Sequence, residues 1–306
     1  MKRAAAIDVG SNSVKLLIAE RAESGLRFLW DEARVTRMGE RLRETGALQQ
    51  DAIERTARAV ADFARMAREA GAEEIACAGT MALREAKNAE AFVQAVQAAC
   101  GLTCRVLPGG EEARLCFAAA CGALAQDGRE TVVMDSGGGS TEFACGRDGV
   151  PRRRVSVPVG AVNVTESFFA GETTEERVRA AREEIADRIG ESGFAMERDA
   201  RLVATGGTAT TMAAVARAVV PYEPEKIRGE EITRREAERQ VALYASLTIP
   251  QRAEIPGMHR GREDVMLAGA CIVAETMRFF GAQRLIVADC GLRHALAQEM
   301  LRINEK

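Results

Sequence analysis

The chain opens with short apolar runs that polar turns separate. Ala4 to Val9 and Val14 to Ala19 flank a turn rich in Gly, Ser and Asn. Two such runs joined by a turn of this kind predict a β-hairpin, and Gly25 to Val35 adds a third strand. From Gln49 to Ala70 the apolar residues recur at helical spacing, which predicts an amphipathic helix.

After this helix, short apolar strands alternate with longer segments of helical periodicity. We expect strands over Ile75 to Ala78 and Cys104 to Leu107, and helices over Asn88 to Ala99 and Glu111 to Leu124. Asn88 is the expected N-cap of its helix, because Asn is a preferred residue at that position. Strands that alternate with helices predict an α/β domain.

The pattern starts again near residue 127. The segment A-A-I-D-V-G-S-N-S at positions 5–13 matches V-V-M-D-S-G-G-G-S at positions 132–140, with Asp8 and Asp135 in the same place, 127 residues apart. Solenoid repeats are only about 20–50 residues long, so a repeat at this distance indicates a duplicated domain.

The second half continues the alternation of strands and helices. Its expected strands are Thr131 to Met134, Thr141 to Cys145, Val155 to Val157, Leu202 to Ala204 and Leu285 to Ala288; its expected helices are Ala161 to Phe169, Thr174 to Ile189, Thr210 to Val219, Arg234 to Leu247, Arg262 to Phe280 and Leu292 to Leu301. We predict domain I over residues 1–126, with a final helix (293–306) packing back on it, and domain II over residues 127–292. No long linker separates them, so we expect a cleft between touching domains.

Composition narrows the classes of function. The 306 residues carry a net charge of −3 and only 4% aromatics, which argues against a nucleic-acid binder. The longest apolar stretch, Leu115 to Ala125, is shorter than the roughly 18–20 residues of a membrane helix. Asp8 interrupts the N-terminus before a signal-peptide core forms. We therefore expect a soluble, cytoplasmic protein that binds neither nucleic acid nor membranes.

Cysteine and histidine usage does not support a zinc or thiol-redox site. The eight cysteines are scattered without C-x-x-C spacing, and the two histidines, His259 and His294, do not form an H-E-x-x-H motif. We expect reduced thiols that lie buried.

Three loops share one design, in which a short Gly-rich polar turn follows an apolar strand. They are Asp8 to Ser13, Asp135 to Thr141, and Thr205 to Thr208. Successive backbone N–H groups in such turns form anion-binding concavities, and the third loop also leads into a helix N-terminus, which favours phosphate. Each loop alone is also compatible with an ordinary turn. Three of them, two in one repeated frame, predict phosphate binding without a P-loop or dinucleotide motif.

Carboxylates interrupt these otherwise apolar segments. Asp135 and Glu142 are candidate ligands of Mg²⁺, which takes one or two carboxylates and completes its shell with water and phosphate oxygens. Asp8 would act on the metal mainly through water. The alternative is that the Asp side chains cap their own turns.

A second acidic pair opens the helix after Pro108. Glu111 and Glu112 there are explained by the helix dipole alone, but beside phosphate loops such a carboxylate could orient and deprotonate a water. The residues alone do not say which Glu this is. Arg84 and Lys87 follow a strand end and are candidates for phosphate contact.

Two basic clusters stand out in this acidic protein. One contains Arg34, Arg37, Arg41 and Arg43, and the other contains Arg152, Arg153 and Arg154. They predict either solvated faces or a guide for a long polyanion.

Taken together, these motifs resemble the exopolyphosphatase / guanosine pentaphosphate phosphatase (Ppx/GppA) family over essentially the whole chain. The matching segments are A-A-I-D-V-G-S-N-S-V-K-L-L-I-A, A-L-R-E-A-K-N, G-G-E-E-A-R-L, V-V-M-D-S-G-G-G-S-T-E-F, A-T-G-G-T, I-P-G-M-H-R-G-R-E-D-V and D-C-G-L-R-H-A-L. The resemblance implies two α/β domains of ribonuclease-H-like fold, the duplicated fold of actin, Hsp70 and sugar kinases, with the active site in the cleft.

The resemblance also implies roles for residues. It places the catalytic carboxylate at Glu112 and a divalent metal, Mg²⁺ or another cation, on Asp135 and Glu142. The residues expected to bind phosphate are Ser11, Asn12, Ser13, Arg84, Gly137, Gly138, Gly139, Ser140, Thr141, Gly206, Gly207 and Thr208.

The expected function is metal-dependent release of terminal orthophosphate from inorganic polyphosphate. Hydrolysis of the alarmone pppGpp to ppGpp is the alternative. An ATP-dependent kinase of the same fold and a non-catalytic sensor of polyphosphate or alarmone are further rivals. The expected partners are polyphosphate, the alarmone in the alternative, and a second copy of the chain in a homodimer.

Overall fold

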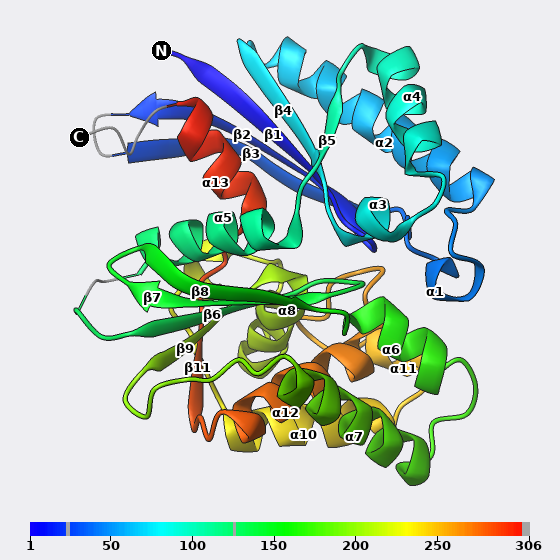
Figure 1. Ribbon diagram of the computed structural model, residues 1–306, viewed down its shortest axis with the longest axis vertical. Coiled ribbons are helices and arrows are strands. Elements are labelled where there is room, and N and C mark those ends of the chain that lie inside the picture. The colour runs from blue at the N-terminus through cyan, green and yellow to red at the C-terminus, as the bar shows by residue number, and fades with distance from the viewer. Residues whose placement is uncertain (23–24, 125–126, 302–306) are drawn as a thin grey trace. The chain divides into compact units, whose positions relative to one another are not determined.

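The computed structural model describes residues 1–22, 25–124 and 127–301, which form two compact units (Figure 1). Unit 1 comprises residues 1–115 and the segment from residue 292 onward, and unit 2 comprises residues 116–291. The division therefore falls inside a helix, eleven residues before the expected boundary at 126/127, because the second half of that helix packs in unit 2. Residues 125–126 of the expected boundary and 302–306 of the expected final helix lie outside the described residues.

Unit 1 is a five-stranded mixed sheet with helices on both faces. Its elements are β1 (Arg3–Val9), β2 (Ser13–Ala22), β3 (Gly25–Val35), α1 (Leu42–Thr45), α2 (Gln50–Glu69), β4 (Glu74–Gly79), α3 (Met81–Glu85), α4 (Ala89–Cys100), β5 (Cys104–Val106), the first half of α5 (Gly109–Gly122) and α13 (Leu292–Met300). The strand order is β3-β2-β1-β4-β5. The first three strands are antiparallel neighbours, and β1, β4 and β5 run parallel.

The alternation of side chains along β1 separates two hydrophobic layers in unit 1. Ala5 and Ile7 belong to the main core, which α2 and α4 cover. Ala4, on the other face, packs with Leu17 of β2 and Ala297 of α13. The final helix thus packs on the first sheet, and the face that it covers is also the face on which Asp8 lies.

Unit 2 is a six-stranded sheet with a thick helical layer on one face. Its further elements are β6 (Thr131–Ser136), β7 (Thr141–Arg147), β8 (Val150–Val157), α6 (Ala161–Phe168), α7 (Glu175–Glu191), β9 (Arg201–Thr205), α8 (Gly206–Arg217), α9 (Pro224–Ile227), β10 (Glu231–Thr233), α10 (Arg234–Ala245), α11 (Ile249–Ala253), α12 (Met266–Phe279) and β11 (Arg284–Val287). The strand order is β10-β11-β9-β6-β7-β8. α12 is the central helix of the core: twelve of its fourteen residues are buried, and both α7 and α10 pack on it.

The two sheets confirm the internal repeat at the level of register. Asp8 lies directly opposite Lys15 in the β1–β2 hairpin, and Asp135 lies directly opposite Glu142 in the β6–β7 hairpin. In each loop the Gly two residues after the Asp donates its N–H to the carbonyl three residues further on, at 3.0 Å in unit 1 and 2.9 Å in unit 2. The strand order matches as well, with β10 as an addition at the edge of unit 2.

Most predicted elements are present, and the differences have local causes. Asn88 stands at the N-cap of α4, but its side chain does not cap the helix. It pairs instead with the backbone of Leu48, accepting from its N–H at 2.8 Å and donating to its carbonyl at 3.0 Å. α8 begins at Gly206, four residues earlier than predicted, because its glycines form the first turn. Among the described residues, no helix is both long and apolar enough to cross a membrane.

Candidate active site

The loop between β1 and β2 turns its carbonyl groups toward the segment that follows β3. The N–H of Gly39 donates to Ser11 O at 2.8 Å, and the N–H groups of Thr36 and Arg37 donate to Asn12 O at 3.0 and 2.8 Å. Among the residues that the structure describes, the N–H groups of Ser11 and Asn12 have no acceptor. The Asn12 side chain is buried, and neither atom of its amide is hydrogen-bonded. Buried polar groups normally find partners, so this loop is equipped for a polar ligand.

Lys15 is the charged partner of Asp8 in the same hairpin. Its Nζ lies 3.3 Å from Asp8 Oδ2, and the carboxylate is largely buried. Lys15 was not predicted from the sequence, because a Lys in a strand is usually only a solvated side chain. The signal was its position seven residues after a repeated Asp, where unit 2 has Glu142.

The start of α5 separates the two glutamates that the sequence left open. Glu112 is buried, and its Oε2 lies 2.5 Å from Nη1 of Arg84, which also donates to Leu107 O at 3.0 Å. Glu111 is more exposed and pairs with Arg105 at the surface. Arg84 comes from α3, just after β4, so the ends of two neighbouring strands bring this pair together. Glu112 therefore has the oriented, partly desolvated carboxylate that a general base requires.

The loop between β6 and β7 in unit 2 repeats this design. The carbonyls of Gly137 and Gly138 accept the N–H groups of Ala161 and Val162, at 3.0 and 2.7 Å, where α6 begins. A side chain at Gly160 would collide with the loop, since its Cβ would lie 2.3 Å from the N atom of Gly139. With its carbonyls turned to α6, the loop presents the N–H groups of Gly138 and Gly139, which have no acceptor within the described ranges. This is the concavity of N–H groups that binds anions.

The remaining predicted loop residues lie within these two hairpins. Ser13 begins β2, and Thr141 begins β7 and donates its hydroxyl to Val159 O at 2.7 Å. Ser140 Oγ donates to Glu142 Oε1 at 2.6 Å, and Ser156 Oγ donates to the same oxygen at 2.7 Å. Two hydroxyl donors on one oxygen fix the orientation of the Glu142 carboxylate.

Asp135 and Glu142 form a donor set that fits a divalent cation. They face each other on the same side of the β6–β7 ladder, where two like charges repel unless a cation offsets them. Cys116 Sγ–H donates to Asp135 Oδ2 at 2.9 Å. The described residues contain no cluster of three or more Asp, Glu, His or Cys side chains that could enclose a metal. Two carboxylates suffice for Mg²⁺, which takes its other ligands from water and phosphate.

The third loop adds a helix N-terminus and a cation that sequence reasoning missed. Gly206 has φ +86°, and a Cβ there would lie 2.6 Å from Asp135 Oδ1, so only glycine lets the start of α8 approach this carboxylate. Gly207 lies against the guanidinium of Arg262. Burial lowers the pKa of Arg262 to about 10, and no ion pair of Arg262 occurs in the described part of the chain. The group still carries its charge at neutral pH, and Thr208 follows in the first turn of α8.

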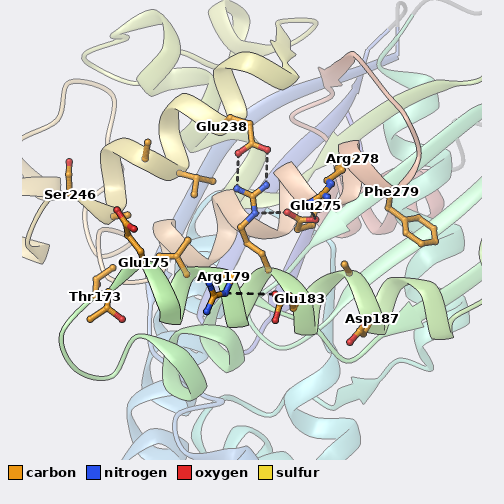
Figure 2. A pocket seen from close by; sticks show the side chains of 17 residues that line it. Thr173, Glu175, Arg179, Glu183, Asp187, Glu238, Ser246, Glu275, Arg278 and Phe279 are labelled. Carbon is orange, nitrogen blue, oxygen red and sulfur yellow. Dashed lines mark hydrogen bonds and ion pairs between the residues drawn. The ribbon is translucent and has the colours of Figure 1, made fainter.

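A separate groove in unit 2 has a different chemistry (Figure 2). Its volume is about 1300 Å³, and it lies between α7 and α10 with the end of α12 beside it. Arg182 is held there by Glu238, at 2.7 and 2.8 Å, and by the buried Glu275, at 2.5 Å. Arg182 is thus paired with two carboxylates, and five carboxylates against three arginines line the groove, so its charge disfavours phosphate.

Comparisons with known proteins agree on one family. The model of the Ppx/GppA phosphatase family matches residues 17–303. Exopolyphosphatase 2 of Mycobacterium tuberculosis is 32% identical over 290 residues, which are 91% of each chain. A bifunctional 3-dehydroquinate synthase/phosphatase of Fusobacterium nucleatum is 28% identical over 297 residues; the match covers 93% of this chain, which spans 44% of that protein.

Solved structures of the same family share the fold. The crystal structure of the Aquifex aeolicus Ppx/GppA family member is 34% identical, with a TM-score of 0.83 over 100% of this chain and 99% of its own. An exopolyphosphatase-like protein solved as a structural-genomics target is 27% identical, with a TM-score of 0.91 over 98% of both chains. These likenesses confirm the predicted fold class.

Proposed function

The chain belongs to the Ppx/GppA phosphatase family, and we propose that within it this protein is an exopolyphosphatase, which releases terminal orthophosphate from inorganic polyphosphate with the help of a divalent cation. The observation that carries the proposal is the pair of matching hairpin loops, each with two N–H groups that have no acceptor among the described residues. The name of the 32%-identical relative, exopolyphosphatase 2, supports polyphosphate as the substrate.

Glu112 is the proposed general base. Its carboxylate would take a proton from the attacking water, whose oxygen forms a bond to the terminal phosphorus while the bridging P–O bond breaks. Phosphoryl transfer needs mainly this alignment and the stabilisation of charge on oxygen. The contact of Glu112 with Arg84 supports the assignment, because it holds the carboxylate in one orientation and links it to a cation suited to phosphate.

The loop N–H groups and nearby cations would hold the phosphates. The N–H groups of Gly138 and Gly139 are fixed by the fold before substrate arrives, so little reorganisation accompanies the reaction. Lys15 and Arg262 add positive charge beside the first and third loops. Unit 1 would contribute one phosphate-binding loop, and unit 2 would contribute two.

Asp135 and Glu142 are the residues that would hold Mg²⁺, which when bound offsets negative charge on the phosphoryl oxygens. Ser140 and Ser156 would keep the Glu142 carboxylate oriented. Asp8 is not proposed as a direct ligand, because its carboxylate already pairs with an ammonium group.

Hydrolysis of pppGpp is the second candidate, since it needs the same base, loops and cation on a different polyphosphate end. A sensor without turnover and an ATP-dependent kinase remain as outcomes of the test. The assay is orthophosphate release from polyphosphates of defined length, pppGpp and ATP, with Mg²⁺ or EDTA. Release from polyphosphate that EDTA stops would support the proposal, and release from pppGpp alone would replace it.

The decisive variant is Glu112→Gln, which removes a base and almost no volume. We expect kcat to fall by about 10²- to 10⁴-fold with little change in substrate affinity. Glu111→Gln is the matched control, since Glu111 pairs with Arg105 at the surface, and it should retain most of the activity. If Glu111→Gln is the inactive variant, the base is assigned to the wrong residue of the pair. Binding without turnover in the wild type would identify a sensor.

A further inference from the structure

Three consecutive arginines lie on β8, the edge strand of the unit 2 sheet. Arg152, Arg153 and Arg154 are all exposed, and among the described strands β8 pairs with β7 alone. The proposed mechanism uses none of them. Successive residues of a strand point to opposite faces of the sheet, so the three are not equivalent.

The register places Arg154 on the face that carries the proposed metal ligands. Ser156 is the β8 residue opposite Glu142, and its hydroxyl reaches that carboxylate at 2.7 Å. Arg154 precedes Ser156 by two residues and therefore projects from the same face, about 7 Å further along the strand. Arg152 comes next, at the irregularity where β8 has one residue more than β7.

Arg153 serves as a structural residue on the opposite face. Its guanidinium stands over the ring of Phe194, 5.6 Å from the centroid, and donates to Gly193 O. No hydrogen bond or ion pair of the Arg154 or Arg152 side chain occurs in the described part of the chain. Two adjacent positions of the same charge thus differ in partner: one is engaged in packing and the other faces solvent.

The equivalent position in unit 1 shows that such a charge can be neutralised within the fold. Leu17 and Ala144 occupy the same place in the two repeats; Asp31 lies opposite the first and Arg154 opposite the second. Asp31 forms a two-pronged ion pair with Arg293 of α13, both contacts at 2.9 Å. Unit 2 has the opposite charge at this position and no counterpart to Arg293 among its described residues.

We propose that Arg154, with Arg152 beyond it, forms a track for the distal phosphates of a long polyphosphate chain. The track leads along β8 away from Glu142, and guanidinium groups suit the regularly spaced oxyanions of linked phosphates. The inference rests on the proposed polyphosphatase function and goes beyond it, since it assigns a preference for chain length. A substrate with only two or three phosphates would have fewer phosphates left to contact the track, because the loops hold the reacting phosphate and its neighbour.

The test compares a long polyphosphate of about one hundred phosphates with tripolyphosphate, for the wild type and Arg154→Gln. We expect the ratio of the long-chain KM to the tripolyphosphate KM to rise about three- to tenfold, with a smaller dependence of long-chain KM on salt concentration. The double variant with Arg152→Gln should raise the ratio further. Arg153→Gln removes the same charge from the same strand and should leave the ratio as in the wild type.

Two results would overturn the track. One is an unchanged ratio in Arg154→Gln, which includes an equal change of KM for both substrates. The other is an equal ratio change in Arg153→Gln, which would indicate net charge alone. If the wild type releases no orthophosphate from polyphosphate, the proposed function fails, and equilibrium binding of long polyphosphate to the same variants decides the track separately. Loss of long-chain affinity in Arg154→Gln but not in Arg153→Gln would then support it, and equal affinities would reject it.

Discussion

The two repeated hairpins share a backbone and differ in charge. Each has an Asp at the end of its first strand, a four-residue loop closed by a Gly N–H and a partner opposite the Asp. That partner is Lys15 in unit 1 and Glu142 in unit 2. Along the adjacent strand the charges reverse once more, with Asp31 in unit 1 and Arg154 in unit 2.

This difference separates what the fold requires from what the chemistry requires. In both units two loop carbonyls accept N–H groups of the segment that follows the third strand, at Ser11 and Asn12 in unit 1 and one place earlier, at Gly137 and Gly138, in unit 2. The presentation of loop N–H groups therefore belongs to the fold. The residue opposite the Asp is free to vary. In unit 1 the hairpin contains its own cation, the ammonium group of Lys15. In unit 2 two carboxylates face each other, and a bound cation would offset their repulsion. We infer that unit 1 binds phosphate through a built-in ammonium and unit 2 through a bound metal.

The largest effect is expected from neutralising the two repeated aspartates, which tests whether the two hairpins differ in metal binding. Asp135→Asn should lower kcat by about a hundredfold and raise the Mg²⁺ concentration needed for half-maximal rate, because it removes a charged ligand. Asp8→Asn, the same change in the other repeat, should shift the Mg²⁺ requirement by less than about twofold. The measurement is orthophosphate release during a Mg²⁺ titration of each variant. Equal shifts would show that both hairpins serve the metal, and no shift in Asp135→Asn would remove it from the metal site.

Substitution of Lys15 tests the other half of the comparison. Lys15→Met keeps the length of the side chain and removes its charge, so we expect KM for polyphosphate to rise about tenfold, as for the loss of one charge-assisted contact. The Mg²⁺ requirement should stay near that of the wild type. Lys15→Arg is the control and should retain most of the affinity. If Lys15→Met changes the Mg²⁺ requirement and not KM, the ammonium acts on the metal site.

Much of the fold was predictable because the signals are local or repeated. The hairpins, the alternation of strands and helices and the duplication all follow from apolar spacing and from two similar segments, as the register of Asp8 and Asp135 confirms. The short elements α9, α11 and β10 were not predicted, since three to five residues carry too little periodicity. The two compact units divide within α5, whereas the sequence pattern predicts a boundary at the turn after this helix, because the division of one uninterrupted helix leaves no sequence signal.

The parts of the candidate site that lie in sequence motifs were predictable. The parts that depend on tertiary contacts were not. The loops and acids were found from the sequence, but the resemblance to a family was needed to choose Glu112 over Glu111. Glu112 pairs with Arg84 and Glu111 pairs with Arg105, and these contacts depend on the tertiary fold. Arg262 contacts the third loop at Gly207, which is 55 residues away in the chain. No local sequence pattern predicts this contact.

The smallest expected effect is on stability. It tests whether Asp31 contributes to stability through its ion pair while Arg154 does not. Arg293→Gln removes the two-pronged ion pair with Asp31, whose side chain is about one-third exposed, and should cost about 1 kcal/mol or less, a drop of about 2–4 °C in Tm. Arg154→Gln should leave Tm within about 1 °C of the wild type, since the described residues form no hydrogen bond or ion pair with the Arg154 side chain. Thermal unfolding at low salt and at 1 M salt checks both, because screening should shrink the Arg293 effect.

A double-mutant cycle with Asp31→Asn isolates the pair, and a coupling near zero would mean that the charge of Asp31 is not neutralised by α13. An Arg154→Gln protein as unstable as Arg293→Gln would mean that Arg154 has a structural partner, and the two strand positions would then differ in sign but not in role.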